Sequence, residues 1–510
     1  MLTPDPIRQR PDLGGVGEVC AVAKRIGSVR PQLVSSGLCL LGTPANEEQR
    51  VTLAREGSRQ RSTDLAWLSN TGEESHFGNM TRFKRLGCIV AGFVLLAFAL
   101  MGLLSITRDT PVHSVGSVGS EGPPAVGDSL FERSFELFTG THVFPGNSVQ
   151  YLSNGNGSYP PLWADMRSAR TSLTVQMYYS LPGKVADTMA VVLEERARAG
   201  VQVYFLIDAF GSQHLSREYL DSMRVAGVHV AKLRTLHWYS ISSANNRSHV
   251  RVVVIDGHLA YTGGFGLADY WLGDGLHPDQ WRDSNVRFDG PAALQLQAAF
   301  SAAWAEATGT LLTGPLFFPD AGFQPRGTMH AGLMFTAPTT GSTPAERFLA
   351  LTIAGARRTL YITNSYFVPD ADFRGLLIAA AKRGVDVRVV TVNQNTDVKI
   401  TWYAGRYYYD ELLEGGVKIY EYQPSMMHSK TIVADGIWGE VGSMNFDNRS
   451  MAFNNEANVV VLDTAFGRQM DSIFMNDLTH TKQITLPSFD QRSRWSKILE
   501  WAASQLDRLL

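Results

Sequence analysis

His249-Val-Arg-Val-Val-Val-Ile-Asp256-Gly257 and His428-Ser-Lys-Thr-Ile-Val-Ala-Asp435-Gly436 are two versions of one pattern, 179 residues apart. In both, a cation follows the histidine after two residues and an aspartate follows the cation after five. A Gly-Gly pair at Gly263 and a Gly-Ser pair at Gly442 lie the same distance downstream. A polar constellation repeated at fixed spacing predicts two structural repeats that contribute to one active site.

The chemistry of this pattern follows from the geometry of an extended chain. Residues i and i+2 point to the same face of a strand, so His249 lies beside Arg251 and His428 beside Lys430. A histidine next to a fixed cation suits a phosphate group, because the cation binds the non-bridging oxygens while charge moves. The Asp-Gly pairs that follow are typical of tight turns. One copy alone could be a core histidine near a hairpin, but two copies with matching glycines argue against that alternative.

A carboxylate lies downstream of each pattern. Trp281-Arg-Asp283-Ser-Asn-Val follows the first histidine, and Asn455-Glu456-Ala-Asn-Val follows the second. A catalytic histidine needs a partner on its other ring nitrogen to fix its tautomer and orientation. We therefore predict that Asp283 and Glu456 orient the two histidines. The alternative is that both are solvated carboxylates at strand ends.

Both patterns resemble the His-Lys-Asp motifs of the phospholipase D superfamily, and residues 131–510 resemble its bacterial cardiolipin synthase branch. The second motif is complete, whereas Arg251 replaces lysine in the first. Arginine keeps the charge but presents a planar fork of donors, so the exchange is not neutral. The segments that resemble the branch are Thr262-Gly263-Gly-Phe-Gly266, Trp281-Arg-Asp283, Leu412-Leu-Glu-Gly-Gly-Val-Lys-Ile-Tyr-Glu-Tyr422 and Gly442-Ser443-Met-Asn445-Phe-Asp-Asn-Arg-Ser450.

The resemblance implies a phosphatidyltransferase that forms a phosphohistidine intermediate. His249 would attack phosphorus and His428 would act as acid and base. The other residues of the expected site are Arg251, Lys430 and Asn445, which would hold phosphoryl oxygens, with Asp256, Asp435, Asp283, Glu456, Ser443 and Gly263. A covalent intermediate splits the displacement into two easier steps, so no metal or other cofactor is expected and activity should survive a chelator.

The expected substrates are phospholipids of a membrane, with phosphatidylglycerol or a similar lipid as acceptor, and the expected state is a monomer. Hydrolysis of a phospholipid or of another phosphodiester is an alternative, and so is a lipid-binding scaffold without activity. The net charge of −2 disfavours nucleic acid as a partner, because no basic field would hold it.

Patterns outside the motifs repeat as well. In both halves an apolar strand precedes an amphipathic helix that a glycine ends, and a second strand follows. The predicted elements are strands 172–179 and 201–207 around helix 185–199, and strands 359–366 and 385–392 around a helix through 373–381. Strand–helix–strand units require a parallel sheet covered by helices. We therefore expect an α/β protein with two pseudo-symmetric repeats, 131–325 and 326–510, each a mixed sheet flanked by helices.

The amino-terminal part has a different composition. Residues 86–106 form an uncharged run of 21 residues, and about 20 apolar residues cross a hydrocarbon core. Arg82, Lys84 and Arg85 precede this predicted transmembrane helix, so the positive-inside tendency places the catalytic part on the extracytoplasmic side of the cell (inner) membrane. A cleaved signal peptide is the alternative. Residues 1–85 are expected to be a disordered leader, with Met80 as an alternative start, and residues 107–130 a flexible linker.

Two aromatic clusters and the positions of the cysteines complete the sequence evidence. The clusters are Trp238-Tyr239, and Trp402-Tyr403 with Tyr407-Tyr-Tyr409. Such side chains either border a lipid entrance or belong to the core. All three cysteines lie at or before Cys88, so no disulfide framework is expected in the catalytic part.

Overall fold

The computed structural model describes residue 90 and residues 92–96, 112–116, 123–234, 246–339 and 341–510. Contacts divide the chain into Met1–Thr81 and Arg82–Leu510, and all the described residues belong to the second unit. The predicted leader 1–85 and the Trp238-Tyr239 cluster lie outside the described residues. Of the predicted span 86–106, residues 90 and 92–96 are described, and they are helical. Among the described residues no helix has both the length and the apolar character that a membrane crossing requires.

The first half of the catalytic part alternates strands and helices as predicted. After helix α2 (Ser129–Thr139), its strands are β1 (Phe144–Ser153), β2 (Ser172–Met177), β3 (Gln202–Asp208), β4 (His229–Leu233), β5 (Arg247–Ser248), β6 (Val252–Ile255), β7 (Leu259–Gly263), β8 (Trp281–Arg282) and β9 (Ser284–Asp289). Its helices are α3 (Asn154–Ser168), α4 (Lys184–Arg198), α5 (Arg217–Val225) and α6 (Ala292–Thr308). The predictions of strands 172–179 and 201–207 and of helix 185–199 are confirmed to within two residues.

The second half repeats this order with additions at its end. Its strands are β10 (Met329–Thr336), β11 (Thr359–Asn364), β12 (Asp386–Thr391), β13 (Lys418–Tyr422), β14 (Met426–Met427), β15 (Lys430–Ala434), β16 (Trp438–Gly442), β17 (Asn454–Leu462) and β18 (Thr481–Ile484). Its helices are α7 (Pro344–Gly355), α8 (Ala371–Lys382), α9 (Lys399–Tyr407), α10 (Tyr409–Glu414), α11 (Asn448–Ala452), α12 (Thr464–Leu478), α13 (Leu486–Asp490) and α14 (Arg494–Ser504). The three elements predicted here from the sequence are confirmed as β11, α8 and β12.

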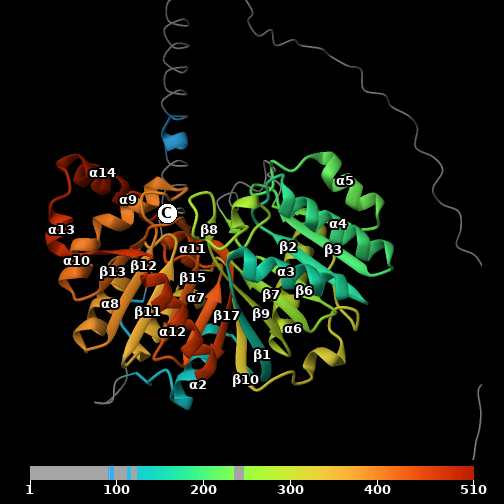
Figure 1. Ribbon diagram of the computed structural model, residues 1–510, viewed down its shortest axis with the longest axis horizontal. Coiled ribbons are helices and arrows are strands. Elements are labelled where there is room, and N and C mark those ends of the chain that lie inside the picture. The colour runs from blue at the N-terminus through green and yellow to red at the C-terminus, as the bar shows by residue number, and fades with distance from the viewer. Residues whose placement is uncertain (1–89, 91, 97–111, 117–122, 235–245, 340) are drawn as a thin grey trace, which may run out of the picture. The chain divides into compact units, whose positions relative to one another are not determined.

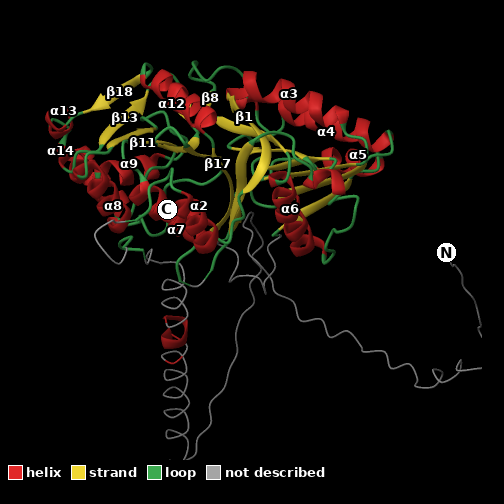
Figure 2. Ribbon diagram, turned by 90° about the horizontal axis from the view of Figure 1, so that it is seen from below, coloured by secondary structure: helices red, strands yellow, loops and turns green. Residues whose placement is uncertain are grey.

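One continuous mixed sheet runs through both halves. From β1 outward the strand order is β9-β7-β6-β2-β3-β4, and from β10 outward it is β17-β16-β15-β11-β12-β13-β18. β1 pairs antiparallel with β10, and this pairing joins the two halves. The expectation of a separate sheet for each repeat is therefore wrong. β1 and β10, the first strands of the two halves, pair with each other and so cover edges that would otherwise be exposed. Helices cover both faces of the sheet (Figures 1 and 2).

The Asp-Gly pairs of the two motifs form the turns that the sequence predicted. Asp256 and Gly257 join β6 to β7 with φ of 48° and 66°, and Asp435 and Gly436 join β15 to β16 with φ of 54° and 65°. Positive φ at both central residues defines the type I′ hairpin turn, whose twist matches that of the flanking strands. The turns fix the register of the strands that follow the two histidines.

Candidate active site

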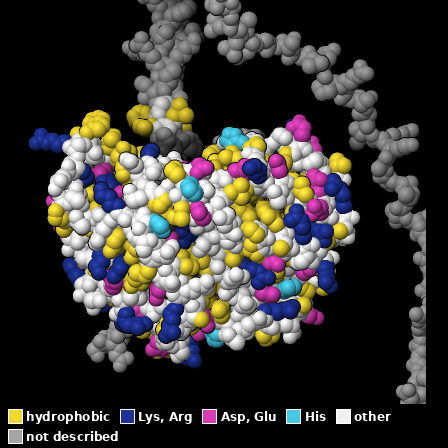
Figure 3. Space-filling model, in the orientation of Figure 1, with side chains coloured by type: hydrophobic (Ala, Val, Ile, Leu, Met, Phe, Trp, Pro, Cys, Tyr) yellow, Lys and Arg dark blue, Asp and Glu magenta, His cyan; other side chains and the backbone are white. Residues whose placement is uncertain are grey.

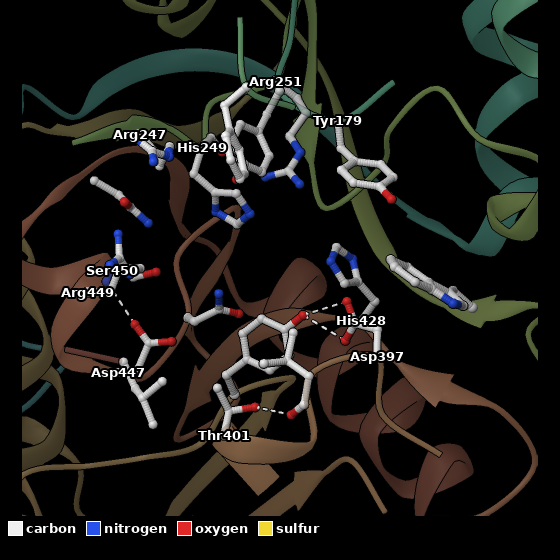
Figure 4. A pocket seen from close by; sticks show the side chains of 18 of the residues that line it. Tyr179, Arg247, His249, Arg251, Asp397, Thr401, His428, Asp447, Arg449 and Ser450 are labelled. Carbon is white, nitrogen blue, oxygen red and sulfur yellow. Dashed lines mark hydrogen bonds between the residues drawn. The ribbon is translucent and has the colours of Figure 1, made fainter. Parts of the chain in front are cut away.

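Both motif histidines open into the same cavity, which has a volume of about 410 Å³. His249 comes from the first half and His428 from the second, and Figure 4 shows their rings directed into one space. His249 is 8% and His428 4% exposed, so both rings are almost entirely shielded from solvent. The duplicated motif therefore forms a single site with one histidine from each half.

The backbone of each histidine is attached to the opposite half. The backbone N–H of His249 donates to the carbonyl of Asn455 at 3.0 Å, where β5 pairs with β17. The backbone N–H of His428 donates to the carbonyl of Arg282 at 2.7 Å, where β14 pairs with β8. Arg282 in turn forms a buried, two-pronged ion pair with Asp477, with N···O distances of 2.9 Å and 2.8 Å. These crossed backbone bonds fix the position of the two histidines relative to one another.

His428 has an ionised partner from the first half. Its Nδ1–H donates to Asp283 at 2.8 Å. The same carboxylate accepts from Trp271 Nε1 at 2.6 Å and from the backbone N–H of Ser284 at 2.7 Å. Although burial opposes ionisation, His428 and nearby Lys430 hold the pKa of Asp283 below its ordinary value. Burial, with Lys430 nearby, lowers the pKa of His428 to about 4, so this imidazole is neutral with its Nε2 lone pair available.

His249 has a partner of different protonation from the second half. Its Nδ1 lies 3.0 Å from Glu456 Oε2. Glu456 also accepts from the Ser443 hydroxyl at 2.6 Å and from Asn454 Nδ2 at 3.2 Å. Burial raises the pKa of Glu456 to about 8. Burial, with Arg251 and Lys430 nearby, lowers the pKa of His249 well below its ordinary value. Near neutral pH, His249 and Glu456 therefore retain one titratable proton between them, and its loss is a property of the pair.

Asp283 and Glu456 thus lie against the two histidines, and the partners are exchanged between the halves. Each carboxylate orients the histidine of the opposite repeat. Sequence spacing could not indicate this exchange, because each carboxylate follows its own motif along the chain.

The motif cations are buried beside the histidines. Arg251 donates to the carbonyls of His249 at 2.7 Å and of Phe265 at 3.1 Å. Lys430 Nζ donates to the carbonyl of His428 at 2.5 Å and to the hydroxyl of Ser365 at 2.8 Å. Burial lowers the pKa of Lys430 to about 7, so a phosphate anion would stabilise its charged form. Arg251 lines the cavity and carries further N–H donors for phosphoryl oxygens, whereas Lys430 is fully buried and is not among the lining residues.

The motif aspartates do not reach the cavity, which corrects their assignment as catalytic residues. Asp256 accepts from the backbone N–H groups of residues 170, 171 and 172 at 2.8 Å to 3.0 Å. Asp435 accepts from those of residues 357, 358 and 359 at 2.7 Å to 2.9 Å. The physical reason is distance along the strand, since each aspartate lies a whole strand length from its histidine. Both carboxylates hold the start of the next strand in place.

The remaining predicted residues divide into two groups. Asn445 lines the cavity, and its Oδ1 is buried without a hydrogen-bond partner among the described residues. Ser443 acts through Glu456, as described above. Gly263 does not line the cavity; it has φ of 142°, and a Cβ there would lie 2.4 Å from Asn285 Oδ1. Gly263 therefore makes room for Asn285, which accepts from the backbone N–H of Phe265 at 3.0 Å.

Several cavity residues were not predicted from the sequence. They are Tyr178, Tyr179, Phe210, Arg247, Trp271, Trp281, Tyr366, Asp397, Val398, Thr401, Asp447, Arg449, Ser450, Asn454 and Leu510. Arg247 could have been found, because it lies two residues before His249 and shares its face of an extended chain. Trp271 and Asp397 lie outside both motifs, and no local pattern marks them.

Comparisons with known proteins agree with this geometry. A family model described as "Cardiolipin synthase, PLD-like domain" matches residues 349–478. The cardiolipin synthase of Geobacillus kaustophilus (strain HTA426) is 33% identical over 360 residues, which are 70% of this chain and 72% of that protein. The cardiolipin synthase of Halalkalibacterium halodurans is 30% identical over 381 residues, 73% of this chain and 76% of that protein. A solved phosphatidylserine synthase from Haemophilus influenzae Rd KW20 shares the fold, with a TM-score of 0.56, 11% identity, and coverage of 74% of this chain and 100% of that one.

Proposed function

The chain belongs to the cardiolipin synthase family of phospholipase D-like proteins, and from that premise we propose that it transfers a phosphatidyl group to the glycerol hydroxyl of phosphatidylglycerol. The observation that carries the proposal is the pair of buried histidines facing one cavity, each held at Nδ1 by a carboxylate. With Nδ1 occupied, only Nε2 of each ring is available to a substrate.

Two displacements at phosphorus complete the proposed reaction. In the first, Nε2 of one histidine attacks phosphorus, the P–O bond to the glycerol headgroup breaks, and the other histidine gives its proton to the departing oxygen. In the second, the hydroxyl of the acceptor lipid attacks phosphorus, the P–N bond breaks, and the hydroxyl proton returns to the second histidine. Arg251 and Asn445 line the cavity and would contact the phosphoryl oxygens in both steps, while Lys430, buried beside His428, would stabilise their charge from behind the cavity wall.

Phospholipid labelled in the phosphate tests this proposal. Acid would hydrolyse the P–N bond of phosphohistidine. The reaction is therefore stopped in alkali, and the labelled peptide is mapped. We expect one labelled histidine and, on addition of unlabelled phosphatidylglycerol, conversion of the label to cardiolipin. Phosphatidic acid as the sole product would show that water is the acceptor, as in a hydrolase. No labelled protein and no product would leave the lipid-binding scaffold as the better account.

We also infer that the catalytic part contacts a lipid surface. On α14, Trp495, Ile498 and Trp501 are 67%, 51% and 53% exposed, and their spacing puts them on one side of the helix. We call this set the apolar face of α14. Tryptophan at an apolar surface favours the boundary between membrane and water. Figure 3 shows hydrophobic side chains beside lysine and arginine at the upper left, where Figure 1 places α14.

The apolar face of α14 is connected to the cavity through one neighbouring helix. α9 packs against α14, and Thr401 of α9 lines the cavity. In the aromatic cluster on this side, Tyr407 is 40% exposed whereas Tyr409 is buried at 2%, so the cluster contributes to both surface and core. Together with the apolar run 86–106, this arrangement supports a protein anchored once in the cell membrane with its cavity near the lipid surface.

Cysteine labelling tests the proposed orientation, because residues after Cys88 contain no cysteine. Ser222 on α5 is exposed, so Ser222→Cys gives the catalytic part a single reactive thiol. In intact cells we expect a membrane-impermeant maleimide to label this cysteine. The native Cys20 and Cys39 should react only after permeabilisation and serve as the internal control. Labelling in the reverse order would place the catalytic part in the cytoplasm.

A further inference from the structure

The two sides of the cavity differ although the two halves repeat each other. β5 pairs with β17 so that Arg247 faces Asn454, and β14 pairs with β8 so that Met426 faces Trp281. These pairings are equivalent, since each immediately precedes a motif histidine and a partner carboxylate. At equivalent positions, the flank of His249 has an arginine and an asparagine, and the flank of His428 has a methionine and a tryptophan.

The polar flank contains two guanidinium groups. Arg247 and Arg449 both line the cavity, and Arg247 lies over the ring of Phe210 at 4.6 Å. Figure 4 shows Arg247 and Arg449 on the side of the cavity next to His249, and Tyr179 on the opposite side. We call Arg247, Arg449 and Asn454 the cationic flank.

The opposite flank is aromatic. The rings of Trp281 and Trp271 lie 4.8 Å and 5.4 Å from the ring of His428, and Trp271 also touches Tyr179 at 6.0 Å. These rings offer mainly apolar surface. The indole N–H of Trp271 already donates to Asp283 and is not available to a substrate. Such a flank suits an acyl-glycerol body, whereas the cationic flank suits an anion.

The distance between His249 and Arg247 matches the reach of a glycerol headgroup. Arg247, His249 and Arg251 all line the cavity, while Ser248 and Val250 between them do not. Two residues of extended chain span about 6.6 Å. The free terminal hydroxyl oxygen and the phosphorus of a glycerol headgroup are separated by five single bonds of ~1.5 Å, which reach about 6 Å in a zigzag. A lipid whose hydroxyl meets His249 therefore has its own phosphate near Arg247.

We propose that the cationic flank binds the phosphodiester of the second phospholipid, so that His249 exchanges protons with the alcohols while His428 carries the phosphatidyl group. This inference rests on the proposed function, because it assigns the two substrates of that reaction to separate sides of the cavity. It also reverses the roles of the histidines that the family resemblance implied.

Buried acceptors in the cavity wall point to hydroxyl groups. Within the described part of the chain, Asn454 Oδ1 has no hydrogen-bond partner, and Asn445 Oδ1 is in the same state. The orientation of Asn454 is fixed, because its Nδ2 donates to Glu456 at 3.2 Å. A buried carbonyl oxygen without a donor is costly, and a glycerol headgroup supplies O–H donors next to its phosphate. Both features of the flank thus fit one ligand, a glycerophosphate headgroup.

Opposite tautomers of the two histidines agree with this assignment. Ionised Asp283 can only accept, so His428 keeps its proton on Nδ1 and presents a lone pair at Nε2. Burial raises the pKa of Glu456 to about 8, so near neutral pH this carboxyl group can donate to Nδ1 of His249 and leave a proton on Nε2. The first arrangement is that of a nucleophile and the second that of an acid.

The steps then balance without any further reactant. Nε2 of His428 bonds to phosphorus as the P–O bond of the first headgroup breaks, and His249 gives its Nε2 proton to that oxygen while taking the proton of Glu456 at Nδ1. The hydroxyl of the second lipid then gives its proton to Nε2 of His249, the Nδ1 proton returns to Glu456, and the P–N bond breaks.

Replacement of Arg247 by the residue at the equivalent position tests the proposal. In full-length protein in mixed vesicles, we expect Arg247→Met to raise the KM for the acceptor lipid at least tenfold and to increase the ratio of hydrolysis to transfer. The rate of phosphoenzyme formation from donor lipid in a single turnover should stay within about twofold, because the donor phosphate lies at the histidines. Arg247→Lys should recover part of the acceptor KM, since the charge is kept.

Arg224→Met provides the matched control, because Arg224 is an exposed residue of α5 that pairs with Asp221 away from the cavity. The proposal is overturned if Arg247→Met leaves the acceptor KM unchanged, or if phosphoenzyme formation falls as much as transfer does. Either result with an active wild-type protein refutes only the assignment of the flank. A wild-type protein that forms neither phosphoenzyme nor cardiolipin refutes the proposed function itself.

Discussion

Removal of the two histidines one at a time should give opposite results when the donor lipid has a leaving group that departs without a proton. The variants are His249→Ala and His428→Ala, and the donors are phosphatidylglycerol and phosphatidyl-p-nitrophenol. Both variants should fail with phosphatidylglycerol, whose glycerol oxygen needs an acid. With the nitrophenyl donor, an acid is dispensable but a nucleophile is not.

The structure sets the size of each effect. General acid catalysis contributes about 10²- to 10⁴-fold, which corresponds to about 3 to 5 kcal/mol in the barrier. His249→Ala should therefore lose that factor with phosphatidylglycerol and recover most of it with the nitrophenyl donor. Loss of a covalent nucleophile costs about 10⁶-fold, and His428→Ala should not recover with either donor. The imidazole side chains are 10% and 6% exposed, so the two truncations perturb packing to a similar extent and the comparison isolates the chemistry.

Rapid-quench measurement of nitrophenolate provides the assay. His249→Ala should release a burst equal to the enzyme concentration, with one phosphatidyl group bound to His428 by peptide mapping. His428→Ala should release no burst. A burst from His428→Ala with label on His249 would refute the assignment and restore the order that the resemblance implied. Equal loss in both variants with both donors would refute the division of roles altogether.

Three further predictions concern protonation, space and stability. Turnover of phosphatidylglycerol should fall about tenfold per pH unit above pH 8, because the proton of the His249–Glu456 pair is lost as pH rises through the raised pKa of Glu456. Turnover of the nitrophenyl donor should show no such fall. A parallel fall for both donors would contradict this prediction. Gly264→Ala should lower turnover at least about 10²-fold, since its Cβ would lie 2.1 Å from Asp283 Oδ1, while Gly157→Ala, with nothing within 4 Å, should have normal activity. Asp435→Ala should lower the free energy of unfolding by about 3 kcal/mol through three lost backbone hydrogen bonds, seen as a lower Tm. The kcat of the folded variant should stay within about twofold of the wild-type value. A normal Tm with lost kcat would restore Asp435 to the catalytic residues.

The parts of the fold that could be predicted are those specified locally. The run 201–207 alternates around a strand, and the helices before it and at 373–381 have apolar residues at helical spacing, so each is recognisable without the rest of the chain. The Asp256-Gly257 turn is equally local, because only two residues must take positive φ. The single cavity could be predicted from the repeat itself, because two copies of one polar motif are expected to contribute to one active site.

The exchange of partners could not be predicted, because it depends on contacts between residues far apart in the sequence. Asp283 lies 145 residues from His428, and Glu456 lies 207 residues from His249. The joining of β1 to β10 is of the same kind, since any exposed strand edge could have accepted another. Pairing of short strands sets these contacts, and neither Arg247-Ser248 nor Met426-Met427 is long enough to be recognised as a strand.

A symmetric fold has to be made asymmetric to perform transfer, because one histidine must attack while the other donates a proton. The carboxylates supply part of this difference. Gly264 leaves the space that Asp283 occupies, so Asp283 receives N–H donors and stays ionised, whereas the equivalent Ser443 donates a hydroxyl to the longer Glu456, which burial keeps protonated. Arg247 supplies the remaining difference by adding charge on the side where the proton is available. The two asymmetries lie on the same side of the cavity, and that coincidence is what a second, anionic alcohol requires: its hydroxyl must meet the acid–base pair at the point where its phosphate meets a cation.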